Sequence, residues 1–447
     1  MALAVSRSLT IIKIHSLRWR RRLIFVGGGL IVGLLAVGLA QASDAVQRIF
    51  QSYLARWPYM PLIVTPLGFA LTVLAVRVFP NTQGSGIPQA IAARKLQDQD
   101  ARARLVGLRV GIGKILLTLF GLLVGASTGR EGPTVQVGAS VMFLIGRITP
   151  RRQPGLILAG AAAGVAAAFN APLAGIVFAI EEMSRSFEVR ASGLIIAAVI
   201  LSGLVAQALL GDYTYFGFTV AALPIGTAWM AVPICGVIGG FSGALFSRTL
   251  VAVPDALPGR ALIRHYPVAF AALCGLGVAL CGLAGGGQIF GTGYQSARAV
   301  LHHTGTVPLD YAPLKLLATA LSSVAGVPGG IFSPSLSVGA GIGADVARFF
   351  HHAAPGPIVL LGMVAYFTGV VRAPITAFVI VSEMSGDHGM LVALMAAALI
   401  ADFCARTVNR EGVYHMLSER FLNPSADDAP QSKVTPAIAA RLAQPTE

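Results

Sequence analysis

The feature that most constrains this chain is a glycine–proline frame that occurs twice. The first copy starts at Gly125 and reads G-A-S-T-G-R-E-G-P-T-V-Q-V-G-A; the second starts at Gly326 and reads G-V-P-G-G-I-F-S-P-S-L-S-V-G-A. A second pair follows in the same order, with A-P-L-A-G-I-V-F-A-I-E ending at Glu181 and A-P-I-T-A-F-V-I-V-S-E ending at Glu383. Internal repeats whose apolar segments are interrupted by glycine and proline are typical of transport proteins with a site between two halves.

The two copies share a backbone frame but differ in chemistry. Without gaps, Gly129 aligns with Gly330, whereas Glu131 falls opposite Phe332. We therefore expect the function to lie where the halves differ.

Composition indicates a membrane protein, because 55% of the 447 residues are hydrophobic and 12% are charged, against about 25% charged residues in soluble domains. Several apolar runs approach the about 20 residues that a membrane-spanning helix needs: Leu23–Ala40, Tyr59–Val76, Ala191–Leu210 and Ala269–Leu283. Shorter runs, broken by glycine or proline, are typical of half-spanning helices: Ile115–Val124, Pro133–Ile145, Leu173–Ile180, Pro334–Ala344 and Pro374–Val381. The sequence predicts an all-α polytopic protein with many tilted or incomplete helices.

The net charge of +14 is concentrated beside the first spans. One basic cluster precedes the first span and another follows the second: Lys13, Arg18, Arg20, Arg21 and Arg22, then Arg94, Lys95, Arg102, Arg104 and Arg109. Two intervening spans put both clusters on one side, which the positive-inside bias makes cytoplasmic. A nucleic-acid partner is not expected, since the basic residues flank apolar spans and Trp19 is the single aromatic residue within the two clusters.

These patterns divide the chain into three parts. We expect a cytoplasmic N-terminal segment at 1–22, a transmembrane domain at 23–420 and a short polar C-terminal tail at 421–447. The two inverted repeats are expected at roughly 60–210 and 230–420. No cofactor or metal is expected, because the four cysteines and eight histidines lack ligand spacing and no Walker A sequence occurs. The histidines are interpreted as solvated residues of loops and segment ends.

Three apolar helices are predicted to begin at glycine-flanked turns with a first-turn proline: Gly84–Pro88, Gly129–Pro133 and Gly330–Pro334. Ser85 in the first of them fits a simple N-cap. It also fits an anion site, because free backbone N–H groups and the helix dipole attract negative charge and a hydroxyl adds a donor. Converging helix starts would bind an anion without a full positive charge beside it, which keeps release fast.

Carboxylates in apolar surroundings are the main candidates for chemistry. Glu131 fits an ion pair with Arg130 or a first-turn dipole interaction. It also fits a gate that competes with the anion for the same N–H donors and leaves when protonated. Glu181 aligns with Glu383, which favours a shared structural role, whereas the adjacent Glu182 fits either a proton-binding carboxyl or a solvated helix end.

Taken together, these motifs resemble the CLC family of chloride channels and proton-coupled chloride transporters. G-S-G-I-P stands at Gly84–Pro88, G-R-E-G-P at Gly129–Pro133 and G-G-I-F-x-P at Gly329–Pro334, while N-A-P-L-A-G-I-x-F-x-x-E-E-M stands at Asn170–Met183. Order and spacing agree over nearly the whole chain. The resemblance implies a fold of two inverted-topology repeats and a homodimer with one pore per subunit, in the inner (plasma) membrane.

The resemblance also implies residue roles. Glu131 matches the external gating glutamate and Glu182 the internal proton-transfer glutamate. Chloride-binding groups are expected at Ser85, Gly86, Arg130, Gly132, Ile331, Phe332 and Tyr414. An acid at position 182 favours chloride/proton exchange, and serine at position 85 favours chloride over nitrate. Gln89 departs from the family, in which many members have Glu after G-S-G-I-P, and the family's C-terminal nucleotide-sensing domains are not expected.

Three alternatives remain open. A passive chloride channel of the same fold differs from an exchanger only through Glu182. An intramembrane serine protease using Ser85 would need a buried histidine base facing it. A purely structural membrane protein would leave Glu131 and the three helix starts without a role.

Overall fold

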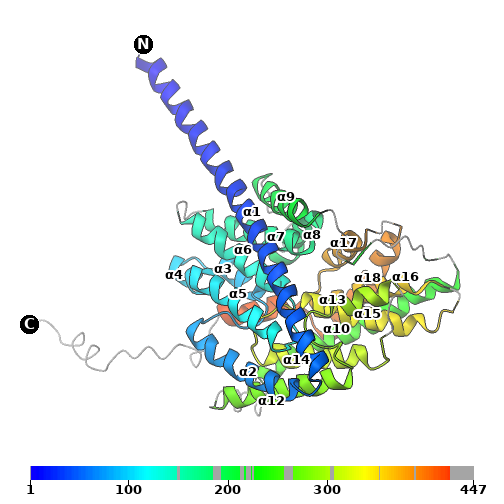
Figure 1. Cartoon of the computed structure of the whole chain (residues 1–447). Helices are drawn as coiled ribbons and strands as arrows, with labels where there is room; N and C mark the ends of the chain where they lie inside the picture. Colours follow the sequence, from blue (N-terminus) through cyan, green and yellow to red (C-terminus); the bar gives the residue numbers. More distant parts are fainter. Residues whose placement is uncertain are drawn as a thin grey trace, which may run out of the picture.

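The computed structural model describes residues 2–147, 152–184, 193–211, 216–217, 223, 226–255, 265–302, 307–351, 353–386 and 389–422. These residues are almost entirely helical, as the sequence predicts, and the helices pack into one bundle (Figure 1). The helices of the first half are α1 (Ala2–Arg56), α2 (Pro61–Val78), α3 (Ile87–Lys95), α4 (Gln99–Val106), α5 (Leu108–Leu123), α6 (Glu131–Gly146), α7 (Gln153–Phe169), α8 (Pro172–Phe178), the π-helix η2 (Ala179–Ser184) and α9 (Gly193–Leu210). Those of the second half are the 3-10 helix η3 (Thr227–Met230), α10 (Ala231–Asp255), α12 (Pro267–Ala284), α13 (Tyr294–Leu301), α14 (Tyr311–Val324), α15 (Phe332–Ala347), α16 (Pro355–Val371), α17 (Pro374–Ser385), α18 (Leu391–Val408) and α19 (Val413–Leu422).

The lengths of the helices fit a membrane protein. Within the described residues, seven stretches are long and apolar enough to cross a bilayer: Arg22–Arg56, Pro61–Val78, Gln99–Leu123, Gly193–Leu210, Thr227–Pro254, Pro267–Ala284 and Leu391–Val408. Four of the runs predicted to be short fall in the short helices α6, α8, α15 and α17, whereas the run predicted at Ile115–Val124 coincides with the end of the long stretch Gln99–Leu123. The prediction of a polytopic helical bundle with incomplete spans is confirmed.

The helices of the two halves correspond in order and in packing. Helix α6 packs on α7 as α15 packs on α16. Glycines permit both close approaches: a Cβ on Gly138 would collide with the backbone of Gly160, and a Cβ on Gly339 would collide with that of Gly362. The repeat seen in the sequence is therefore a repeat of helix pairs.

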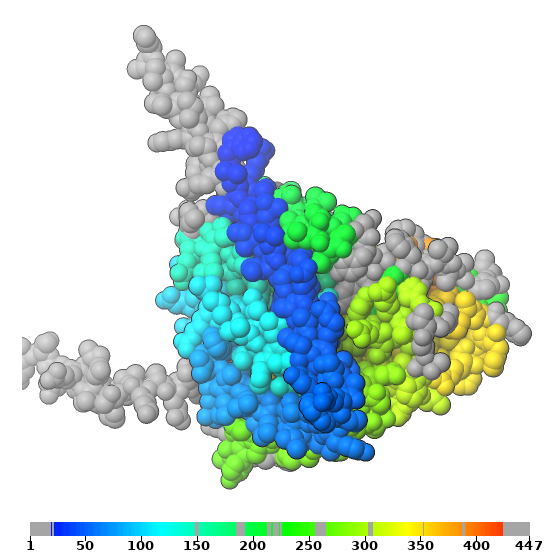
Figure 2. Space-filling view, viewed as in Figure 1, coloured from blue at the N-terminus to red at the C-terminus, as the bar shows by residue number. Residues whose placement is uncertain are grey.

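Helix α1 is longer than the apolar run predicted at Leu23–Ala40, and it contacts α5, α6, α7 and α9 of the first half. Figure 2 shows it lying over the seam between the cyan first half and the yellow-green second half. Its polar side chains reach loops of both halves, because Asp44 pairs with Arg130 and Gln47 accepts a hydrogen bond from the Thr292 N–H (3.0 Å). Residues 2–22 of the predicted N-terminal segment belong to this helix, and residues 423–447 of the predicted tail lie outside the described residues.

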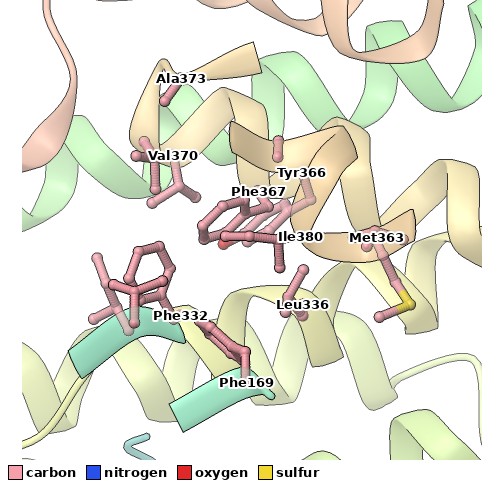
Figure 3. Packing of buried hydrophobic residues seen from close by; sticks show 14 of the residues in the cluster. Phe169, Phe332, Leu336, Met363, Tyr366, Phe367, Val370, Ala373 and Ile380 are labelled. Carbon is pink, nitrogen blue, oxygen red and sulfur yellow. The ribbon is translucent and has the colours of Figure 1, made fainter. Parts of the chain in front are cut away.

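An aromatic cluster lies in the centre of the core at the start of α15. The ring of Phe332 packs against those of Phe169 and Phe367, with centroid distances of 5.7 and 4.9 Å (Figure 3). Phe178 and Tyr414 complete the cluster at 5.9 and 5.7 Å from Phe332. The position that aligns with Glu131 is thus the centre of an apolar contact between helices of both halves.

Candidate anion and proton site

The two copies of the glycine–proline frame meet each other directly. The N–H of Gly129 donates to the carbonyl of Gly330, and the N–H of Gly330 donates to that of Gly129, both at 2.6 Å. This antiparallel pair is the only β-bridge within the described residues. Because each glycine occupies the same place in its repeat, the reciprocal bonds indicate a local two-fold relation between the halves.

The three predicted helix starts converge at this junction. Gly86 precedes α3 with φ of 96°, a left-handed conformation that favours glycine. A Cβ on Gly132, in the first turn of α6, would collide with the Ser85 hydroxyl and lie 3.0 Å from the Cα of Gly330. Ile331 immediately precedes α15 and Phe332 begins it. The first-turn N–H groups of these helices, which lack intrahelical acceptors, therefore lie close together.

Glu131 lies at this convergence and is fully buried. Its Oε1 atom accepts a hydrogen bond from the Ser333 hydroxyl at 2.5 Å. A first-half carboxylate is thus held at the N-terminal turn of a second-half helix, where negative charge is favoured. This placement is the one that competition between Glu131 and an anion would require.

The side chain of Arg130 is directed to α1. Its Nη1 atom donates to the Ala40 carbonyl and to Asp44, both at 2.6 Å. The guanidinium is therefore held on α1, and a chloride-binding role for Arg130 would fall to its backbone.

Ser85 and Tyr414 bring two hydroxyl groups to the same place. Both hydroxyl oxygens are buried and make no protein hydrogen bond of ordinary geometry. The Tyr414 phenol lies beside the Ser85 hydroxyl and within electrostatic range of the Glu182 and Glu131 carboxyls. These side chains form one cluster, in which an anion would find two hydroxyl donors beside the helix starts. No described histidine is hydrogen-bonded to Ser85, so the base that a serine protease needs is not in place.

Glu182 is buried, with a relative exposure of 1%, so its interpretation as a solvated helix end is wrong. It lies in the π-helix η2, and π-helical turns are frequent at functional sites. The ring of His415 binds the Glu182 carbonyl through Nε2 at 2.8 Å, and the same nitrogen lies 3.7 Å from Glu182 Oε1. The prediction that all histidines are solvated is therefore wrong for His415, which packing places inside the protein.

Glu181 and Glu383 exchange caps between the two halves. Glu181 accepts from the N–H groups of Ile375 and Thr376 at the start of α17, at 3.1 and 2.6 Å. Glu383 accepts from those of Leu173 and Ala174 at the start of α8, at 3.1 and 2.7 Å. The shared structural role inferred for this pair is confirmed, and each carboxylate satisfies N–H groups that a helix start leaves open.

The sequence reasoning missed two buried lysines. Lys114 donates to the carbonyls of Thr82 (2.8 Å) and Gly84 (2.5 Å), immediately before Ser85. Lys315 donates to the carbonyls of Ile289 (2.7 Å) and Gly291 (2.8 Å), before the start of α13. The two side chains hold equivalent loops in the two halves. The available signal was a single lysine inside each apolar run, at corresponding positions of the repeat.

Gln89 has a defined partner in the loop before Ser85. Its Nε2 atom donates to the Gln83 carbonyl at 2.8 Å. A carbonyl only accepts hydrogen bonds, so an ionised glutamate at this position would repel it. The amide therefore helps to hold the loop that carries Ser85.

No group of three or more potential metal ligands occurs among the residues that the structure describes.

Comparison with known proteins places this geometry in a family. Residues 67–406 match the sequence profile described as voltage gated chloride channel. The chain belongs to the CLC family. An H(+)/Cl(-) exchange transporter ClcA of Yersinia pestis bv. Antiqua (strain Angola) is 30% identical over 430 residues, which cover 88% of this chain and 86% of the relative. A ClcA of the same description from Citrobacter koseri is 30% identical over 433 residues, covering 90% of this chain and 89% of the relative.

Solved structures share the CLC fold. A slow cyanobacterial Cl-/H+ antiporter superposes with a TM-score of 0.77 at 26% identity, covering 91% of this chain and 99% of that one. A CLC-type fluoride/proton antiporter superposes at 0.74 with 20% identity, covering 89% of this chain and 97% of that one, a similarity that concerns the fold. The resemblance inferred from the motifs is confirmed, and the chain is a multi-pass membrane protein of this family.

Proposed function

We propose that this protein is a chloride/proton antiporter. The observation that carries the proposal is that two buried carboxylates, Glu131 and Glu182, both lie within electrostatic range of the Tyr414 phenol, which lies beside Ser85. The exchange activity named for the ClcA relatives supports it. Chloride is the proposed anion, bound by Ser85, Tyr414 and the N–H groups at the starts of α3, α6 and α15, with Gly86, Gly132, Ile331 and Phe332 contributing backbone.

Glu131 is the proposed gate. Ionised, its carboxylate stays with Ser333 at the start of α15 and occupies a place that attracts anions. Protonated, it loses the charge that holds it there, and chloride takes its place. One protonation of Glu131 therefore accompanies each replacement of its carboxylate by chloride. The movements of the two ions are thus coupled through a single side chain.

Glu182 is the proposed internal proton-transfer residue. Its burial supports this role, because a carboxyl that is shielded from bulk water exchanges its proton only with the groups that contact it. Chloride needs no contact with Glu182, since the hydroxyls of Ser85 and Tyr414 are proposed to complete its path. Proton and anion routes would thus share Glu131 and separate below Tyr414.

The positive-inside bias supports a cytoplasmic position for Glu182. Arg94, from the basic cluster after the second span, donates to the Met183 carbonyl at 2.6 Å. The basic cluster and η2 therefore lie at one end of the bundle, which we propose to face the cytoplasm together with the N-terminus. The inner membrane is the proposed location.

The deciding experiment uses purified protein in chloride-loaded vesicles, with chloride efflux and external pH recorded together. Antiport predicts that chloride efflux drives protons into the vesicles against their gradient. Chloride efflux without proton movement would establish a passive channel instead. In the Glu182→Gln variant we expect chloride to cross while proton uptake stops, and unchanged coupling would remove Glu182 from the proton route.

The proposed homodimer rests on the family resemblance. Mass measurement of the detergent-solubilised protein, with the bound detergent subtracted, tests it directly. A mass of one chain across a wide range of protein concentrations would overturn it.

A further inference from the structure

His415 is a buried titratable side chain that the proposed mechanism does not use. It lies one residue after Tyr414 in α19, and 5% of its surface is exposed. Its Nε2 atom reaches both the carbonyl of Glu182 (2.8 Å) and the Oε1 atom of the same residue (3.7 Å). Helix α19 thus places the Tyr414 phenol beside Ser85 and the His415 imidazole beside the Glu182 carboxyl.

The hydrogen bond fixes the chemistry of the ring. A carbonyl oxygen only accepts, so Nε2 must carry a proton and donate. A second proton therefore adds at Nδ1 and makes the ring a cation. That cation would lie within 4 Å of the Glu182 carboxylate, where opposite charge favours the ionised carboxyl.

We propose that His415 is a positioning residue for Glu182, which holds the η2 turn and sets the pH range over which Glu182 exchanges protons. This inference rests on the proposed antiport function. Histidine suits the role because its charge ordinarily changes between about pH 5 and 8. Below this range the His415 cation promotes release of the Glu182 proton, and above it the effect disappears.

The two arginines near this end of the bundle, Arg94 and Arg420, donate to other partners. Arg94 of α3, the helix that packs most closely on α19, donates to the Met183 carbonyl (2.6 Å) and the Ser184 hydroxyl (3.1 Å). Arg420 of α19 itself donates to the Val251 carbonyl of α10 at 2.7 Å. Helix α16 carries no charged residue between Pro355 and Val371, and its one ionisable group is the Tyr366 phenol. On its own helix, Tyr414 precedes His415, and Glu419 and Arg420 follow in the next turn. Among these elements, His415 is the group that changes its charge between about pH 5 and 8 and lies within 4 Å of the Glu182 carboxylate.

The test compares His415→Gln with the wild-type protein and with His302→Gln in reconstituted vesicles. Glutamine retains an N–H donor for the Glu182 carbonyl but cannot become a cation. His302 is the matched control, because its ring binds the Phe216 carbonyl at 2.5 Å and no carboxylate contact is described for it. Proton and chloride fluxes are recorded together at cytoplasmic-side pH values from about 5 to 8.

Without the cation, Glu182 keeps its proton to higher pH. We therefore expect the pH at which half of the proton coupling is lost to rise by about one unit in His415→Gln, the lower end of the effect of a nearby opposite charge. His302→Gln should match the wild type. A His415→Gln profile identical to the wild type, in protein of normal thermal stability, would reduce His415 to a packing residue.

A second variant covers the case in which His415→Gln does not fold. His415→Arg keeps a positive charge at all these pH values, because a guanidinium is not deprotonated in proteins, so its coupling should lose the wild-type change between about pH 5 and 8. A persistent change in that variant would contradict the proposal. If the wild-type protein moves chloride without protons, the proposed antiport function is wrong. If the wild type couples the two ions and the variants have the same pH profile as the wild type, only the role of His415 is wrong.

Discussion

Ser333 donates its hydroxyl to the carboxylate of Glu131 across the junction of the two halves, at 2.5 Å. The two residues come from the two copies of one glycine–proline frame, and the donor lies in the first turn of α15. The second half thus provides the N-terminus of α15, and the first half provides the Glu131 carboxylate that binds there. The alignment of Glu131 with Phe332 explains why only one such carboxylate exists at the junction.

Replacement of Glu131 by Gln should abolish proton coupling and leave chloride flux measurable. The amide still fits beside Ser333 but cannot take up or release a proton. Simultaneous recording of chloride efflux and external pH checks this, and continued proton pumping by the variant would remove Glu131 from the mechanism.

Substitution of Ser85 by Pro should shift the anion preference from chloride toward nitrate. A hydroxyl donor to a charged partner is lost, which costs about 1.5–3 kcal/mol. The chloride/nitrate permeability ratio in vesicles measures the effect, with Ser85→Thr as the variant that keeps the hydroxyl. An unchanged ratio in the proline variant would mean that Ser85 only caps α3.

Gly132→Ala should disrupt the anion site more than the fold. The added Cβ would collide with the Ser85 hydroxyl and approach Gly330 Cα at 3.0 Å, so the helix starts must separate. We expect chloride binding by calorimetry to fall by about tenfold or more, which is about 1.4 kcal/mol. Gly155→Ala is the control, because nothing lies within 4 Å of the Cβ it would add. Equal chloride affinity in both variants would contradict the convergence at Gly132.

A comparison of Lys114→Met with Lys315→Met should distinguish a lysine that supports chloride binding from one that only holds a loop. Each substitution leaves two buried carbonyls without their donor, at a cost of about 1–3 kcal/mol apiece in stability. Only Lys114 lies beside Ser85, so only its loss should also weaken chloride binding. Thermal unfolding and calorimetric titration of both variants check this, and equal chloride affinities would limit Lys114 to loop support.

The exchanged caps predict matched losses of stability. Glu181→Ala and Glu383→Ala should each lower the free energy of unfolding by about 1 kcal/mol, because each removes a side chain that caps a helix start. Thermal unfolding of the two single variants measures this. A large loss in one and none in the other would show that the caps are not equivalent.

The fold class could be predicted because its signals are local. Apolar length, glycine and first-turn proline mark α6, α15 and α17 in the sequence alone. The same signals selected Ser85, Glu131 and Glu182, because a carboxylate or a glycine-flanked serine beside an apolar helix is conspicuous wherever the chain folds. Tyr414 was different, since a tyrosine after the last apolar run is unremarkable without the family resemblance.

The partners of these residues could not be predicted, because they come from distant segments. The pairing of Arg130 with Asp44 depends on α1 remaining helical beyond its apolar run. The burial of His415 depends on α19 packing against α3 and reaching η2.

The sequence by itself determined the repeat, the helix starts and the candidate carboxylates, because each follows from residue type and spacing along a few turns. Only the tertiary structure decided that Gly129 binds Gly330, that Glu181 and Glu383 cap each other's halves, and that His415 touches Glu182. The physical reason is that a buried polar group must find a partner wherever packing places it. Which partner it finds is set by the two-fold packing of the halves, which no local stretch of sequence records.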